Sequence, residues 1–184
     1  MIQVFDNVLS EKDNNTIQSL ITNDWFPWYV SKEDIILDSY KDVCLSHSQF
    51  THSLYNEEIF GSSGKAIRSP HFNTFFYFVK QFIELYKVNG SLYRMKLNCQ
   101  YQDNRFVDKY NPIHIDEHTP HKSLLYYINE SDGDTIFFKD GKEIQRVSPK
   151  KNRLVISDGP IDHCSSNPIK TELRYVLNTV ILTK

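Results

Sequence analysis

The sequence predicts an α+β fold in which N-terminal helices pack on the major sheet of a double-stranded β-helix, or jelly roll. Two observations carry this prediction. Residues 1–90 contain two amphipathic helical patterns, and from Ser91 onward the apolar period shortens from about 3.6 to 2 in short runs rich in Val, Ile, Tyr and Phe. We expect the 184 residues to form one domain, with a helical and irregular part over 1–90 and the jelly-roll core over 91–184.

The first helix is expected over residues 11–23. Ser10 is a suitable N-cap residue, and Asp13 supplies an acid in the first turn. Apolar residues then follow at helical spacing, at Ile17, Leu20 and Ile21. This pattern predicts a surface helix with one buried face.

The second helix has stronger signals. Ser69 and Pro70 predict an N-cap followed by the first helical residue, and Asn89 with Gly90 predicts its end. An apolar stripe runs between them, at Phe72, Phe75, Phe76, Val79, Phe82, Ile83 and Tyr86. We interpret this stripe as core packing.

The strands are expected in the C-terminal half, as short runs separated by turn residues. These runs cover residues 91–101, 111–116, 123–129, 135–138, 144–148, 153–157 and 174–183. Asp140 and Gly141 form a dipeptide typical of a tight hairpin, and Asp132–Gly133 and Asp158–Gly159–Pro160 mark two further connections. Residues 25–68 are the least legible part, with one strand expected around Trp28–Val30 and long loops elsewhere.

Composition narrows the function classes. The 21 basic and 23 acidic residues give a formal net charge of −2 without long runs of either sign, so nucleic acid and anionic membrane surfaces are not indicated as partners. Cys44, Cys99 and Cys164 are too few and too widely spaced for a disulfide framework or a structural zinc module. With neither a signal peptide pattern nor a membrane-spanning stretch, the expected location is cytoplasmic.

A metal site is predicted around the stretch YNPIHIDEHTP. On a strand, His114 and Asp116 would project from the same face, and a cation would offset the cost of burying them together. His163 is the best candidate for a third ligand from a distant strand. Two imidazoles and one carboxylate favour a non-haem Fe(II) site, although this ligand set leaves zinc open.

Four nearby residues compete for a role in this site and are expected to play none as ligands. His118 and His121 should lie in an exposed loop near the pocket mouth, because Pro120 ends the preceding strand. Glu117 should point away from the other ligands to the surface. Cys164 is expected to be a small core residue.

Arg174 is the second predicted functional residue. It begins an apolar run in which Arg174, Val176 and Asn178 would share one face of a buried strand. A buried guanidinium needs an anion, which either a protein carboxylate or a bound ligand carboxylate would supply.

These residues together resemble a known family. The order of an HxD motif at 114–116, YYIN at 126–129, GDT at 133–135, a distal histidine and an arginine opening the last long strand is similar to that of the 2-oxoglutarate- and Fe(II)-dependent dioxygenases. The resemblance is closest to their prolyl-hydroxylase-like branch and to small bacteriophage members, and it covers about residues 91–182. The sequence departs from the branch at Asp132, which precedes Gly133 where Gly-Gly is usual.

The resemblance implies a role for each matching residue. His114, Asp116 and His163 would bind iron, and Arg174 would pair with the distal carboxylate of 2-oxoglutarate. Other contacts to the cosubstrate would come from Tyr127, through its hydroxyl, from Asn178, and at the opposite end from Tyr101 or Asn98. The implied reaction consumes O2 and 2-oxoglutarate, hydroxylates a substrate, and releases succinate and CO2.

The substrate and two other function classes stay open. The resemblance suggests a prolyl or other peptide side chain, and a small molecule is equally compatible; residues 25–68 and the loop 103–112 are expected to shape its pocket. A cupin-like or zinc-dependent jelly-roll enzyme would use the same metal ligands without 2-oxoglutarate. A non-catalytic jelly-roll binding module would tolerate loss of the metal.

Overall fold

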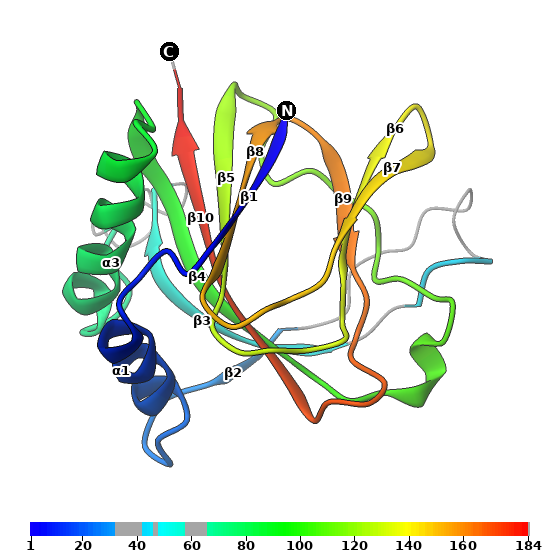
Figure 1. The fold of residues 1–184 in the computed structure, drawn as a ribbon, viewed down its shortest axis with the longest axis horizontal. Coiled ribbons are helices and arrows are strands. Elements are labelled where there is room, and N and C mark those ends of the chain that lie inside the picture. Colours follow the sequence, from blue (N-terminus) through cyan, green and yellow to red (C-terminus); the bar gives the residue numbers. More distant parts are fainter. Residues whose placement is uncertain (32–41, 46–47, 58–65, 184) are drawn as a thin grey trace.

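The computed structural model describes residues 1–31, 42–45, 48–57 and 66–183. Its strands form a seven-stranded sheet in the order β1-β8-β5-β10-β4-β3-β2 and a three-stranded sheet in the order β7-β6-β9, and paired strands are antiparallel. The two sheets face each other, and helices α1 and α3 cover the outer face of the large sheet (Figure 1). This arrangement confirms the predicted jelly roll with N-terminal helices on its major sheet.

The strand bounds are as follows. The large sheet contains β1 (Ile2–Asp6), β2 (Tyr29–Ser31), β3 (Gln49–Asn56), β4 (Ser91–Tyr101), β5 (His121–Tyr127), β8 (Arg153–Gly159) and β10 (Leu173–Leu182). The small sheet contains β6 (Thr135–Lys139), β7 (Lys142–Val147) and β9 (Asp162–Ser165). A short 3-10 helix, η2 (Asn104–Phe106), follows β4.

Helix α1 (Glu11–Ile21) begins as predicted and ends two residues earlier than expected. The Ser10 hydroxyl accepts a hydrogen bond from the backbone N–H of Asp13 at 3.1 Å, as an N-cap should. Ile17 and Ile21 are buried, and Asn14 on the same face donates to the Tyr126 hydroxyl at 2.6 Å. Polar and apolar contacts therefore both attach this helix to the large sheet.

Helix α3 (Phe72–Leu85) begins later than the sequence predicted. Its N-cap is His71, and the predicted cap Ser69 instead accepts from the backbone N–H of His71 at 3.0 Å. Ser69 is also within 2.7 Å of His52 Nε2 on β3, so its hydroxyl joins the helix entry to the sheet. The buried face includes Phe78, which the predicted stripe omitted, whereas Phe76, Ile83 and Tyr86 are only partly buried.

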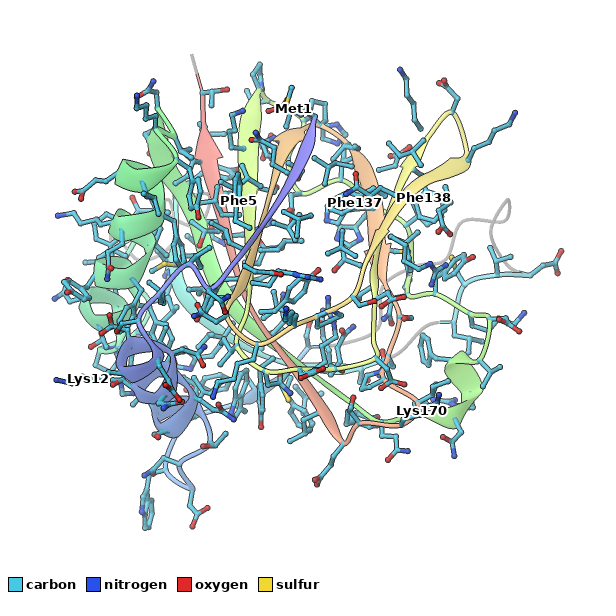
Figure 2. The ribbon with its side chains drawn as sticks, viewed as in Figure 1. Met1, Phe5, Lys12, Phe137, Phe138 and Lys170 are labelled. Carbon is cyan, nitrogen blue, oxygen red and sulfur yellow. The ribbon has the colours of Figure 1, made fainter. Side chains whose placement is uncertain are left out.

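Two hydrophobic cores hold these layers together. The larger lies between the helices and the large sheet, where Phe75 and Phe82 pack on Leu97. The smaller lies between the sheets and contains Phe137 of β6, whereas the adjacent Phe138 belongs to a third cluster on the other face of the small sheet (Figure 2). Successive residues of β6 thus face opposite sides, as a strand requires.

Several strand predictions were wrong or incomplete. Residues 111–116 do not form a strand, and only His114 makes an isolated bridge; Pro112 has no N–H to donate, which interrupts a ladder. The strands β1, β3 and β9 were not predicted. Residues 1–90 are therefore less irregular than expected, because they supply β1, β3 and the short β2. Of these, β2 lies close to the strand expected at Trp28–Val30. Part of the poorly legible 25–68 segment lies outside the described residues.

No helix among the described residues is long and apolar enough to span a membrane.

Candidate metal centre

The three predicted metal ligands come together between the two sheets. His114, Asp116 and His163 each offer a ligand atom, and these atoms all lie within 4.8 Å of one another. His163 Nε2 is 3.6 Å from Asp116 Oδ2, and the two imidazole centroids are 4.7 Å apart. His163 lies on β9, whereas the other two ligands lie on the segment that connects η2 to β5. The spacing suits one divalent cation held from two directions.

The backbone fixes the relative position of the two histidines. His114 N–H donates to His163 O at 3.0 Å, and His163 N–H donates to His114 O at 2.9 Å. Each ring is also oriented locally, because Nδ1 of His114 lies 3.0 Å from Pro112 O and Nδ1 of His163 lies 3.0 Å from Ile161 O. A carbonyl can only accept, so each Nδ1 carries a proton, and Nε2 is the ring nitrogen that is left to bind a metal.

The Asp116 carboxylate is held by three donors. Ser123 Oγ donates to Oδ2 at 2.8 Å, Asn178 Nδ2 donates to Oδ1 at 3.3 Å, and Arg94 Nη2 forms an ion pair with Oδ1. Burial raises the pKa of Asp116, but the positive charges of His163, Arg94 and Lys96 together lower it below its usual value. The carboxylate is therefore ionised at neutral pH and ready to bind a cation.

The competing residues are placed elsewhere. His118 is exposed, as expected, and Glu117 is half-buried, where its carboxylate accepts from the N–H groups of His118 and Thr119. The prediction for His121 was wrong, because β5 begins there and the side chain is 4% exposed. Its ring lies against Gly159, where an added Cβ would come within 2.0 Å of His121 Cε1. Pro120 ends the irregular segment before it, and strand β5 starts at the next residue.

Arg174 lies in the same cavity, at the other end from the metal ligands. It is 4% exposed, and its guanidinium donates to three neutral acceptors: Gly133 O at 2.7 Å, Gln100 Oε1 at 2.8 Å and Thr135 Oγ1 at 2.8 Å. No carboxylate pairs with it among the residues that the structure describes. Burial lowers the pKa of Arg174, yet a guanidinium stays protonated in proteins. The described chain thus supplies hydrogen bonds and the nearby negative charge of Asp134, but no carboxylate in contact with the guanidinium.

Tyr127 lies behind Arg174 and does not line the cavity. It is fully buried, its hydroxyl donates to Thr135 Oγ1 at 2.7 Å, and the Arg174 Cζ atom is 5.6 Å from its ring centroid. Burial raises the pKa of Tyr127, so the hydroxyl is a neutral donor. In this arrangement Tyr127 supports Arg174 and Thr135 from the core side.

Strand β4 supplies one wall of the cavity by alternation. Lys96, Asn98 and Gln100 face the cavity, whereas Met95, Leu97 and Cys99 face the helices. Asn98 therefore lies where a cosubstrate role requires, but Tyr101 is on the opposite face and is 38% exposed. Gln100, which the sequence analysis missed, accepts a hydrogen bond from Arg174 and donates one to Ser165 Oγ at 2.8 Å. The signal was present as polar residues at every second position from Arg94 to Gln100.

The cavity has the donor set that an iron ion and a dicarboxylate need. It is lined by His114, His163, Asn98, Leu125, Arg174 and Asn178, so the two candidate histidine ligands and the arginine open into one space. The side-chain oxygens of Asn98 and Asn178 are buried there without hydrogen-bond partners among the described residues. Buried polar atoms without partners are rare. These two amide oxygens are acceptors and indicate a water or ligand group that donates, whereas the charge of Arg174 indicates an anion. We conclude that the residues fit both groups.

Sequence comparison finds no relative: no family model matches the chain, and no curated protein matches it. Structural comparison does find similar folds. A 2OG-Fe(II) oxygenase family oxidoreductase from Burkholderia pseudomallei superposes with a TM-score of 0.71 at 10% identity, over 98% of this chain and 84% of that one.

Two further structures share the fold and carry ligands. A prolyl hydroxylase from Trichoplax adhaerens, in complex with a hypoxia inducible factor peptide, has a TM-score of 0.63 at 12% identity and covers 98% of this chain and 83% of its own. The epimerase SnoN from nogalamycin biosynthesis, in complex with Fe3+, α-ketoglutarate and nogalamycin RO, has a TM-score of 0.58 at 10% identity, over 98% and 78%. The chain thus has the fold of the 2OG-Fe(II) oxygenases.

Proposed function

We propose that the chain is a non-haem Fe(II)- and 2-oxoglutarate-dependent dioxygenase that hydroxylates a substrate and releases succinate and CO2. One observation carries the proposal: a His-Asp-His cluster and a buried arginine without a carboxylate partner among the described residues open into the same cavity. The fold is compatible with many chemistries, so the proposal depends on these residues and not on the fold.

The metal would be held by His114, Asp116 and His163. When bound, Fe(II) with 2-oxoglutarate would supply the activation of O2, which no amino acid side chain can perform. In both histidines Nδ1 donates to a backbone carbonyl, so Nε2 is the nitrogen that would bind the metal. The proposal assigns to the chain the orientation of these ligands and the exclusion of water by the apolar residues between the sheets.

Arg174 would bind the distal carboxylate of 2-oxoglutarate. A guanidinium has five N–H donors, and three of them are used by Gly133, Gln100 and Thr135. The two left are one on each terminal nitrogen, which is the pair that a carboxylate accepts in a bidentate contact. Asn98 and Asn178 would face the cosubstrate or the substrate nearer the metal. We propose that Tyr127 acts on this carboxylate through Thr135 and Arg174, because its hydroxyl already donates a hydrogen bond to Thr135 Oγ1.

A specific observation favours this function over the alternatives. A zinc-dependent jelly-roll enzyme without 2-oxoglutarate, or a binding module without a metal, has no use for a buried guanidinium that faces the metal cavity. The cost of burying such a charge is high unless an anion accompanies it. Among the described residues Asp134 is near enough to act on the charge of Arg174, but it pairs with Arg146 and forms no ion pair with Arg174.

The test is anaerobic titration of the protein with Fe(II) and 2-oxoglutarate. The proposal expects a weak visible charge-transfer band that needs both additions and is absent when Zn(II) replaces Fe(II). The matched control for loss of Arg174 is Arg153→Met, which removes an arginine that pairs with Asp6 and does not line the cavity, and which should leave the band unchanged. A parent protein that binds Fe(II) but shows neither the band nor 2-oxoglutarate-dependent stabilisation would contradict the proposal.

The substrate is approached by a separate screen. The fold neighbours include one protein bound to a peptide and one bound to nogalamycin RO, so we include prolyl and other peptide side chains as well as small molecules among the proposed substrates. Succinate release above the uncoupled background, measured across peptide, amino acid and metabolite pools, would identify the class.

A further inference from the structure

Arg94 has a position that the proposed reaction does not require of an arginine. It lies on β4, its side chain is 18% exposed, and its Nη2 pairs with Oδ1 of Asp116, whose side chain is 2% exposed. A carboxylate that is meant to attract a divalent cation is therefore already paired with a permanent positive charge. This pairing weakens the attraction of Asp116 for a metal, because the cation lies beside the ligand itself.

The hydrogen bonds distinguish the two oxygens of Asp116. Each carboxylate oxygen has about two lone-pair sites. Oδ1 accepts from both Arg94 and Asn178, so its sites are filled. Oδ2 accepts from Ser123 alone and faces His163 Nε2 at 3.6 Å, so one site is left on the metal side.

We propose that Arg94 is a positioning residue that restricts Asp116 to metal binding through Oδ2 alone. With Oδ1 occupied, Asp116 contributes one ligand atom, and together with the two imidazoles it fills one face of an octahedral metal. Three positions then stay open. A bidentate carboxylate would take one of these and leave too few for a chelating 2-oxo acid and O2 together.

The proposed role and a purely structural role predict opposite changes in metal affinity when Arg94 is removed. If Arg94 only stabilised the fold or the Asp116 rotamer, its loss would loosen the site and weaken metal binding, as loss of an outer-shell partner usually does. If Arg94 blocks Oδ1, its loss removes a repelling cation and also frees a second ligand oxygen. Both effects strengthen metal binding, at the expense of the open positions.

The experiment measures metal binding by Arg94→Met and by a second apolar variant, Arg94→Leu, which keeps the test open if the first does not fold. Co(II) and Mn(II) affinities are measured by titration without 2-oxoglutarate or O2. We expect both variants to bind about tenfold more tightly than the parent, within the range known for outer-shell changes. Broadening of the Mn(II) EPR signal by 17O-labelled water should show one fewer coordinated water in the variants. The affinity of the Fe(II)-loaded variants for 2-oxoglutarate should fall.

Two controls separate this role from other effects. Arg153→Met removes an Arg–Asp pair outside the cavity and should leave metal affinity unchanged. Arg94→Lys keeps the positive charge beside Oδ1 and should return affinity toward the parent value. Unchanged or weaker metal binding by Arg94→Met and Arg94→Leu, or an unchanged number of coordinated waters, would overturn the inference.

The inference rests on the metal site of the proposed function but not on 2-oxoglutarate. A parent protein that binds no divalent metal would refute both. A parent that binds metal and 2-oxoglutarate, with variants that do not bind metal more tightly, would refute only the role of Arg94.

Discussion

Replacing Arg174 by methionine gives the sharpest test of the proposed cosubstrate site. The side chain is 4% exposed, so solvent does not screen its interaction with a bound carboxylate. Two of its N–H donors stay unassigned after the contacts to Gly133, Gln100 and Thr135. A hydrogen bond to a charged group contributes about 1.5–3 kcal/mol, so the loss of both corresponds to about 3–6 kcal/mol, or roughly 10²- to 10⁴-fold in Kd.

The assay compares 2-oxoglutarate with pyruvate, which is a 2-oxo acid without the distal carboxylate. Binding is measured by anaerobic titration of the Fe(II)-loaded protein. The parent should prefer 2-oxoglutarate by the factor above, and Arg174→Met should bind the two acids about equally, because it lacks the group that distinguishes them. Affinity for pyruvate should change little, which controls for damage to the metal centre. A variant that retains the full preference for 2-oxoglutarate would refute the assignment of Arg174.

Three further predictions follow from the structure. Divalent metal should raise the melting temperature of the parent in a concentration-dependent manner, and His163→Ala should abolish this rise; an equal rise in the variant would place the metal elsewhere. Asp132→Asn should lower the free energy of unfolding at neutral pH by about 1–3 kcal/mol, because the Asp132 carboxylate accepts hydrogen bonds from the loop 169–171. Burial raises the pKa of Asp132, but these bonds lower it overall below the usual 3.8, so their contribution is present above that pH and is lost as pH falls further; urea unfolding should therefore show a weaker acid dependence in the variant. Gly159→Ala should destabilise the protein by about 1–3 kcal/mol, because the new Cβ would lie 2.0 Å from the His121 ring, and a thermal melt at the parent value would contradict this packing.

Much of the architecture could be predicted because the C-terminal strands are buried on one or both faces. The β4 run has a period-2 pattern and the β10 run is a long, largely apolar stretch buried on both faces, and their predicted extents differ from the structure by at most a residue at either end. The N-terminal strands could not be found in this way. β1 is an edge strand with an irregular burial pattern, so its sequence carries little alternation.

The proximity of the three candidate metal ligands could be predicted, but for a partly wrong reason. His114 and Asp116 were expected to converge because they alternate on a strand, whereas the segment is held by a single bridge and by side-chain contacts to Asp116. Arg94 and Gln100 were missed because their partners are distant in sequence, and Ser123 was missed because it reaches Asp116 across an irregular segment; no local pattern specifies which polar residue meets which. Long-range pairing of this kind becomes visible only when the strands are in register.

The bridge between His114 and His163 also bears on how this centre could change. The two imidazoles are placed by main-chain N–H and C=O groups, which every non-proline residue possesses, so the spacing of these positions does not depend on the histidines themselves. Cysteine or glutamate at either position would inherit the same placement. The backbone would therefore hold other ligand side chains at positions 114 and 163, so the proposed centre is suited to laboratory evolution toward metals other than iron.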